Sequence, residues 1–264
     1  MEEFNHIMFF EDGHKYVNME DRSTYMSVTQ LIEKVKPDVN WDFWAVYKHL
    51  QDVTGAKPRH NKDKETLFYK NKWVHYSRFS KEAEAKRKEW NDKADVAKER
   101  GTFLHLYLEN LFNNKVIAIP NGYSVRGANR FYKDHRHLKP VYAEMIVGDD
   151  QYMIAGQVDR PFLVKPGVID IYDFKTDEEI KQSNRFESLK APVNDLDDCN
   201  FSKYTLQLNL YRWIIEKNTK YKVRNLKIVH ITDTDYILYA IPKYDVSTLV
   251  NEIRGTHKQP EACH

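Results

Sequence analysis

The segment Val168–Phe174 constrains the fold more than any other part of this 264-residue chain. It reads Val-Ile-Asp-Ile-Tyr-Asp-Phe and is mostly apolar, which is typical of a strand that is buried on both faces. Two apolar stretches precede it, Val141–Val147 and Tyr152–Val164, and Gly148-Asp149-Asp150 between them predicts a hairpin. A sheet that is buried on both faces needs helices on both sides. The sequence therefore predicts an α/β fold around one central sheet.

The remaining elements follow from local periodicity. Short strands are expected within Ile7–Leu31, around the turn Asp12-Gly13, and two late strands at Leu226–Thr232 and Tyr236–Pro242. The polar segment Glu178–Phe201 is expected to be a loop. Helical spacing and breakers predict helices at Thr29–Val35, Trp41–Gln51, Ser80–Arg100, Thr102–Phe112, Ser124–Leu138, Tyr204–Lys217 and Val246–Ile253.

Composition excludes several classes of protein. Hydrophobic residues make up 41% of the chain and charged residues 30%, which is enough apolar matter for a core. No apolar run approaches the roughly 18 residues of a membrane helix, and the acidic start MEEFNHIMFF lacks the basic region of a signal peptide. Cys199 and Cys263 are too few for a disulfide framework or an iron–sulfur cluster. The sequence has no phosphate-binding Walker loop, so we expect no bound nucleotide. We expect a cytoplasmic protein without a membrane partner.

Two carboxylates and a lysine form the most suggestive pattern. Strand alternation places Asp173 and Lys175 on one face, and Asp159 on the neighbouring hairpin strand can bring a second carboxylate to the same point. Converging carboxylates suit a hard divalent cation, and a nearby lysine can orient or deprotonate a water that attacks phosphorus. Taken alone, the Asp-x-Lys pattern also fits a surface ion pair at the end of a strand.

Two polar patterns lie on helices. Gly101-Thr102 and His105 stand at an expected helix start, and Gln207 and Tyr211 lie one turn apart on an otherwise apolar helix. Each is ambiguous by itself. A lone helical histidine is usually structural, and a Gln–Tyr pair is more often a hydrogen bond at the edge of the core.

In this order and spacing, Gly101-Thr-x-x-His105, Gly156-x-x-Asp159, Asp173-x-Lys175 and Gln207-x-x-x-Tyr211 resemble the RecB-like branch of the PD-(D/E)xK nucleases. Tyr25-Met-Ser-Val-Thr-x-Leu-Ile32 extends the resemblance to phage exonucleases and the mitochondrial genome maintenance exonuclease. The resemblance implies a restriction-endonuclease-like core, with a central mixed sheet flanked by helices, in a phage or bacterial setting.

The resemblance also implies roles for individual residues. His105, Asp159, Asp173 and the Phe174 carbonyl would bind one or two Mg²⁺ or Mn²⁺ ions, and Lys175 would activate the water. Gln207 and Tyr211, together with Thr102, would contact the DNA. Glu144 is spaced where relatives often carry a Glu; it would assist a second metal or hold Lys175, and a structural ion pair explains it equally well.

Residues 57–98 are unusually basic and aromatic. This segment holds 13 Lys or Arg against seven Asp or Glu, with Phe68, Tyr69, Trp73 and Tyr76 among the charges. Cations neutralise phosphates and aromatic faces stack on unpaired bases, so Lys70, Lys72 and Trp73 are candidates for binding single-stranded DNA. The aromatic residues fit equally well as the small core of a solvated lobe.

These patterns predict a divalent-metal-dependent DNA exonuclease that acts on single strands or free ends. The alternatives are a structure-specific or defence-type endonuclease of the same fold and a decayed nucleic-acid-binding module; RNA as substrate and a helicase or recombination partner stay open. We expect an N-terminal lobe of strands and helices at 1–98 packed on a nuclease core at 99–255, and a flexible tail at 256–264.

Overall fold

The computed structural model describes residues 2–141 and 145–255. The chain divides into two compact units, a larger one of residues 1–37 and 101–264 and a smaller one of residues 38–100. The smaller unit ends at residue 100, whereas the expected N-terminal lobe was 1–98, and residues 1–37 lie with the larger unit. They do so because β3 (Thr24–Ser27) pairs in parallel with β9 (Ile154–Val158). The expected tail at 256–264 lies outside the described residues.

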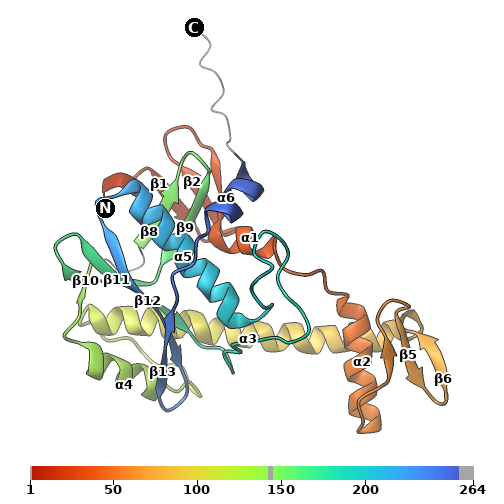
Figure 1. The fold of residues 1–264 in the computed structure, drawn as a ribbon. Coiled ribbons are helices and arrows are strands. Elements are labelled where there is room, and N and C mark those ends of the chain that lie inside the picture. The colour runs from red at the N-terminus through yellow and green to blue at the C-terminus, as the bar shows by residue number, and fades with distance from the viewer. Residues whose placement is uncertain (1, 142–144, 256–264) are drawn as a thin grey trace. The chain divides into compact units, whose positions relative to one another are not determined.

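The larger unit contains two five-stranded sheets instead of the single expected sheet (Figure 1). The first has the order β1-β2-β3-β9-β8, with β1 (Ile7–Phe10), β2 (Lys15–Asn18) and β8 (Met145–Asp149). The second has the order β13-β12-β11-β10-β7, with β13 (Tyr236–Ile241), β12 (Lys222–Ile231), β11 (Val168–Lys175), β10 (Arg160–Lys165) and β7 (Lys139–Pro140). Only Asp159 separates β9 from β10, so it lies where the chain passes between the sheets.

Strand β11 is buried along almost its whole length, as its apolar sequence predicted. It pairs in parallel with β12 and antiparallel with β10, which makes the second sheet mixed. Ile169 and Ile171 face one hydrophobic core, while Tyr172 and Phe174 face the other. This alternation places Asp173 and Lys175 on the face of the two isoleucines.

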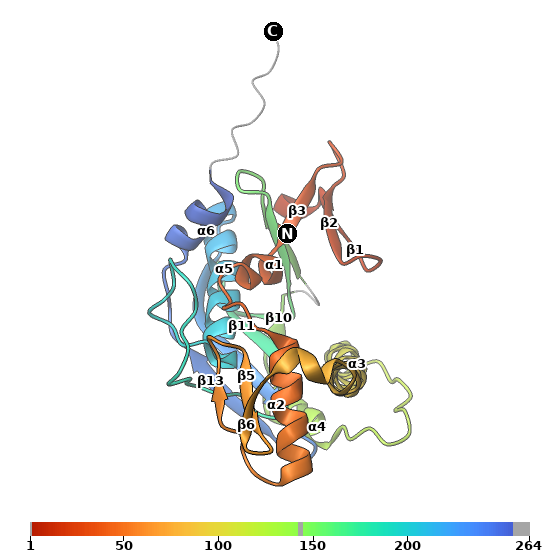
Figure 2. The same ribbon diagram turned by 90° about the vertical axis from the view of Figure 1, so that its right-hand side faces the viewer.

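Helices cover both faces of the second sheet, which confirms the expected α/β class (Figure 2). The core around Ile169 and Ile171 takes apolar side chains from α1 (Val28–Glu33), α5 (Asn200–Asn218) and α6 (Ser247–Arg254). The core around Phe174 takes them from α4 (Arg126–His135) and from residues 101–112 of α3. No described helix combines the length and the apolar character needed to cross a bilayer.

Helix α3 (Ser80–Phe112) is one element of 33 residues. The sequence predicted two helices broken before Thr102, and this prediction is wrong because Gly101 is helical. A glycine inside a helix costs only about 1 kcal/mol, which tertiary packing offsets. Here a Cβ at position 101 would lie 3.1 Å from Thr176 Oγ1, so Thr176 packs closely against the helix at this point.

The smaller unit has a core and a sheet of its own. Helix α2 (Trp41–Thr54) was predicted from its spacing, and it supplies Phe43, Val46 and Leu50 to this core. The three-stranded sheet was not predicted; it consists of β4 (His60–Asn61), β5 (Thr66–Tyr69) and β6 (Lys72–His75). A 3₁₀ turn (Tyr76–Phe79) leads from β6 into α3.

Candidate active site

Asp159 joins three of the sequence motifs. Its Oδ2 accepts the backbone N–H of Phe174 at 2.8 Å and lies 3.4 Å from Nδ1 of His105. The carboxylate therefore connects the end of β9, the end of β11 and helix α3. A paired strand on each side of Asp159, β9 before it and β10 after it, holds its backbone in place.

Asp173 and Lys175 are paired at the end of β11. Lys175 Nζ lies 2.5 Å from Asp173 Oδ2, and the Asp173 side chain is only 1% exposed. Among the described residues, Asp173 Oδ2 accepts no further hydrogen bond. The pair is thus buried within the protein, unlike the surface ion pair that the short motif alone also fits.

The charges of the site shift one another's pKa values. Burial, and next the negative charge of Asp159, raise the pKa of Asp173 to about 6. Burial lowers the pKa of Lys175, but the two aspartates outweigh it and the pKa ends above its ordinary value. Two buried carboxylates that repel each other favour an additional cation between them.

His105 and Asp159 stabilise each other's charged forms. Burial lowers the pKa of His105, but the charge of Asp159 and the contact with it outweigh burial and raise it. Burial raises the pKa of Asp159, but the charges of His105 and Lys175 lower it below its ordinary value. The ring of His105 lies edge-on to that of Phe174, with 6.0 Å between centroids, which holds the imidazole beside β11.

Tyr211 reaches the site through the gap left by Gly156. A Cβ at Gly156 would lie 2.6 Å from Tyr211 Cε1, so only glycine at this position of β9 lets the Tyr211 ring, on α5, approach this closely. Gln207 Nε2 donates to the Tyr211 hydroxyl at 3.0 Å. Burial, and then the charge of Asp173, raise the pKa of Tyr211 well above its ordinary value. The second and fourth motifs therefore meet by direct packing.

A set of residues that sequence reasoning missed surrounds Lys175. The Lys175 ammonium lies 4.9 Å from the ring centroid of Tyr204, whose hydroxyl donates to Asp177 Oδ2 at 2.6 Å. Asn200 Nδ2 also donates to Asp177, at 3.2 Å, and His230 Nε2 lies 2.7 Å from the Asp177 carbonyl. Two features of the sequence could have pointed to them. Asp177 follows Lys175 by two residues, and Tyr204 precedes Gln207 by three residues, close to one helical turn.

A small cavity of about 10 Å³ lies beside His105 and Asp159. Glu109, Arg160 and Phe174 complete its lining. Its volume is close to that of one water-sized probe. Glu109 follows His105 by one helical turn, which is the only signal by which the sequence could have identified it.

The residues fit a divalent cation in their chemistry but do not form a complete ligand group. Asp159, Asp173 and His105 offer oxygen and nitrogen donors, and the buried Asp173 Oδ2 has Lys175 as its charged neighbour. In the part of the chain that the structure describes, no three His, Cys, Asp or Glu side chains are grouped so that they could hold a metal ion. The metal therefore stays a prediction.

The other candidate residues have different surroundings. Glu144 lies outside the described residues. Thr102 is exposed on α3, one turn before His105. The three remaining DNA-binding candidates belong to the smaller unit, where Lys70 occupies a hairpin turn and Lys72 and Trp73 open β6.

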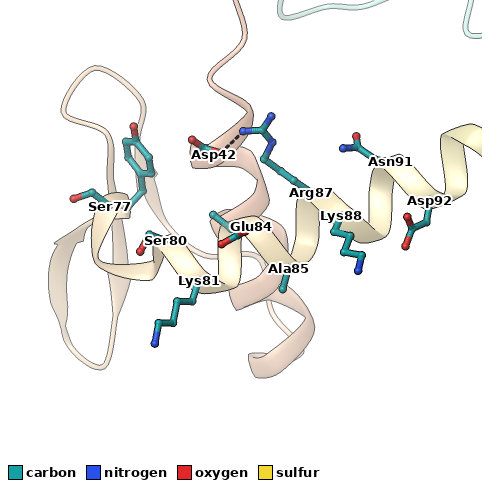
Figure 3. A pocket seen from close by; sticks show the side chains of 12 residues that line it. Asp42, Ser77, Ser80, Lys81, Glu84, Ala85, Arg87, Lys88, Asn91 and Asp92 are labelled. Carbon is teal, nitrogen blue, oxygen red and sulfur yellow. Dashed lines mark hydrogen bonds and ion pairs between the residues drawn. The ribbon is translucent and has the colours of Figure 1, made fainter.

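The smaller unit also contains a groove of about 950 Å³ along the first turns of α3 (Figure 3). Charges of both signs line it, including Lys81, Glu84, Lys88 and Asp92. The one ion pair drawn there joins Arg87 Nη1 to Asp42 Oδ1 at 2.8 Å. Mixed and self-paired charges of this kind are typical of a solvated surface.

Comparison with known proteins identifies no family. No protein-family model and no curated protein match the chain. Among solved structures it is similar to a "Putative exonuclease" from Eubacterium rectale, with a TM-score of 0.31 and 12% identity over 58% of this chain and 61% of that one. The chain thus spans less than two thirds of that protein. It is also similar to the protein SSO0001, with a TM-score of 0.30 and 17% identity over 79% of this chain and 81% of that one. Similarity at this level assigns neither fold nor function.

Proposed function

We infer that the chain is a divalent-metal-dependent deoxyribonuclease that hydrolyses phosphodiester bonds, acting as an exonuclease on single-stranded or end-bearing DNA. One observation carries this proposal. Side chains from four separate segments, His105, Asp159, the Asp173–Lys175 pair and Tyr211, converge around the end of β11. Neither an ordinary surface ion pair nor an apolar core needs this combination.

The proposal gives each candidate residue a role. Asp159, Asp173, His105 and the Phe174 carbonyl would hold Mg²⁺ or Mn²⁺, and Glu144 would assist. When bound, the ion supplies positive charge against the phosphate and helps to activate the attacking water. Lys175, buried and held in its charged form by both carboxylates, would orient that water and donate a hydrogen bond or a proton to the reacting phosphate. Gln207, Tyr211 and Thr102 would contact the DNA backbone.

The test is cleavage of end-labelled linear single-stranded DNA and of a closed circle of the same sequence, with Mg²⁺, Mn²⁺ or EDTA. We expect the linear strand to be lost only with metal and the circle to stay intact. Removing a general acid or base typically costs about 10²–10⁴-fold, so Lys175→Ala should abolish detectable cleavage. Its affinity for DNA should be largely unchanged.

Lys217→Ala is the matched control. Lys217 also pairs with a buried aspartate, 2.7 Å from Asp149 Oδ2, but away from the candidate site. This variant should cleave like the parent. Cutting of the circle would change the assignment to an endonuclease of the same fold. DNA binding without any cleavage would favour a nucleic-acid-binding module and refute the enzyme.

A further inference from the structure

The sheet of the smaller unit has one face in the core and one face outside it. Leu67 of β5 pairs with Val74 of β6, and both are buried. Tyr69 lies on the same face, and it packs against the core of the smaller unit together with Tyr76, Phe79 and Trp90. Of the four aromatic residues for which the sequence left this choice open, the core explanation therefore holds for Tyr69 and Tyr76.

Phe68 and Trp73 lie on the opposite face. They are a directly paired couple across β5 and β6, and their ring centroids are 5.5 Å apart. Neither ring belongs to the core cluster, and Trp73 is 48% exposed. An exposed tryptophan beside a half-buried phenylalanine is a large apolar area that the fold of this unit does not use.

A cation lies over this aromatic pair. The guanidinium carbon of Arg59 is 5.0 Å from the Phe68 ring centroid and 5.7 Å from that of Trp73. Arg59, Phe68 and Trp73 are called the aromatic face below. Lys57, Arg59, Phe68 and Lys70 also line a neighbouring hollow of about 460 Å³.

The charge around the aromatic face is strongly positive. Residues 57–72 contain six Lys or Arg against two acids, Asp63 and Glu65. Glu65 accepts from Asn40 Nδ2 at 2.8 Å and lies 3.5 Å from His75 Nε2. With both acids counted, the segment still has four more cations than anions. Lys70 sits with Asn71 in a hairpin turn at positive φ, 47° and 63°, and is exposed there.

We propose that the aromatic face binds single-stranded DNA, with unpaired bases stacked on Trp73 and Phe68 and phosphates neutralised by Lys57, Arg59 and Lys70. Charge complementarity selects a polyanion, and the exposed rings select one whose bases are free to stack, which a duplex does not offer. The proposal deepens the proposed function, on which it rests for the substrate class. Of the sequence candidates it retains Trp73 and Lys70, whereas the register places Lys72 on the opposite face of β6.

The test is binding of a fluorescently labelled oligo(dT) to the full-length protein in EDTA, measured by anisotropy at several salt concentrations. Stacking on an aromatic ring is worth about 1–3 kcal/mol per base, so Trp73→Ala should raise Kd about 5- to 140-fold. Trp73→Phe, which keeps an aromatic ring, should recover part of the loss. Lys70→Ala should reduce the slope of log K against log salt by about 0.7.

Trp41→Ala is the matched control, because Trp41 is a 58% exposed tryptophan of the same unit that lies outside the sheet and contacts Trp90. It should bind like the parent. Equal losses for Trp41→Ala and Trp73→Ala, or no loss for Trp73→Ala in a protein with unchanged circular dichroism, would overturn the proposal. The proposal would also be overturned if a DNA duplex bound as tightly as oligo(dT), or if oligo(U) bound more tightly than oligo(dT).

These measurements fail separately from the cleavage test. Binding in EDTA needs no catalysis, so Trp73-dependent binding without any cleavage would support the aromatic face and refute the nuclease. Metal-dependent cleavage, together with a Kd for oligo(dT) that Trp73→Ala leaves unchanged, would support the nuclease and refute DNA binding by the aromatic face.

Discussion

Replacing Gly156 by alanine tests the contact that brings two of the motifs together. The new Cβ would lie 2.6 Å from Tyr211 Cε1 and 3.2 Å from Val28 Cγ2. Both neighbours are buried, with Tyr211 4% and Val28 1% exposed, and Tyr211 is also held by Gln207. The ring therefore cannot swing into solvent to make room.

The expected cost follows from two opposing effects. Inserting a methyl group into a packed core costs about 1–3 kcal/mol. Alanine is favoured over glycine within a strand by about 0.5–1 kcal/mol, which offsets part of that cost. Gly156→Ala should thus lower the free energy of unfolding by about 1–2 kcal/mol, measured from urea denaturation followed by circular dichroism.

Gly101→Ala is the control, since its new Cβ would meet only Thr176 Oγ1, at 3.1 Å, and would gain about 1 kcal/mol of helix propensity. It should be neutral or stabilising. In a Tyr211→Leu background the cost of Gly156→Ala should shrink, because its closest neighbour is gone. A variant as stable as the parent, or a cost that is unchanged in that background, would refute this account of Gly156.

Three further predictions test other parts of the chain. Asp170 accepts from Arg224 Nη2 at 2.6 Å and from Asn225 N at 3.0 Å; burial raises its pKa, but these contacts outweigh burial and lower it. Its stabilisation is therefore present above the unfolded pKa of about 3.9 and is lost as pH falls through the lower folded pKa. Asp170→Asn should thus cost about 1–2 kcal/mol at pH 7, after allowance for the exposed Arg224, and progressively less in urea titrations at pH values below about 3.9. Tyr204→Phe keeps the ring 4.9 Å from Lys175, so its cleavage rate should stay within about threefold of the parent's. Tyr204→Leu removes the ring, and its rate in single-turnover assays should fall about 3- to 30-fold. Equal rates for the two variants would exclude a role for the ring. Leu67→Ala should destabilise the smaller unit by about 2–5 kcal/mol, seen in the fluorescence of its four tryptophans, of the five in the chain; an unshifted transition would contradict the assignment of Leu67 to the core.

Strong periodicity made most of the larger unit predictable. The β8–β9 hairpin, the buried strand β11, helix α5 and the late strands β12 and β13 agree with the expected segments. Nothing in the sequence marked Asp159 as a break between two sheets, because its neighbours Val158 and Arg160 continue the strand pattern. The sequence thus identified the strands but not where one sheet ends.

The smaller unit was harder to predict because its signals are weak. Strands β5 and β6 have four residues each, and the turn between them is Lys70-Asn71, without the glycine that usually marks such a hairpin. The division of its aromatic residues between core and surface depends on register, which composition does not contain.

The candidate site was predicted in part. The resemblance and the strand alternation predicted that Asp159, Asp173 and Lys175 lie close together, and in the structure they do so, beside His105 and Tyr211. Asp177, Tyr204 and Glu109 were missed because each becomes meaningful only through a partner that is distant in sequence or on a helix face. Contacts of this kind depend on how elements pack, which local patterns do not specify.

The parallel pairing of β3 with β9 also sets the order in which the chain can fold. β3 leaves the ribosome early, but its partner β9 is synthesised only after the whole smaller unit and helices α3 and α4. Closing so long a loop is entropically costly and slow, whereas residues 38–100 are contiguous and their contacts are local. During synthesis the smaller unit can therefore complete its core before β9 is available to pair with β3.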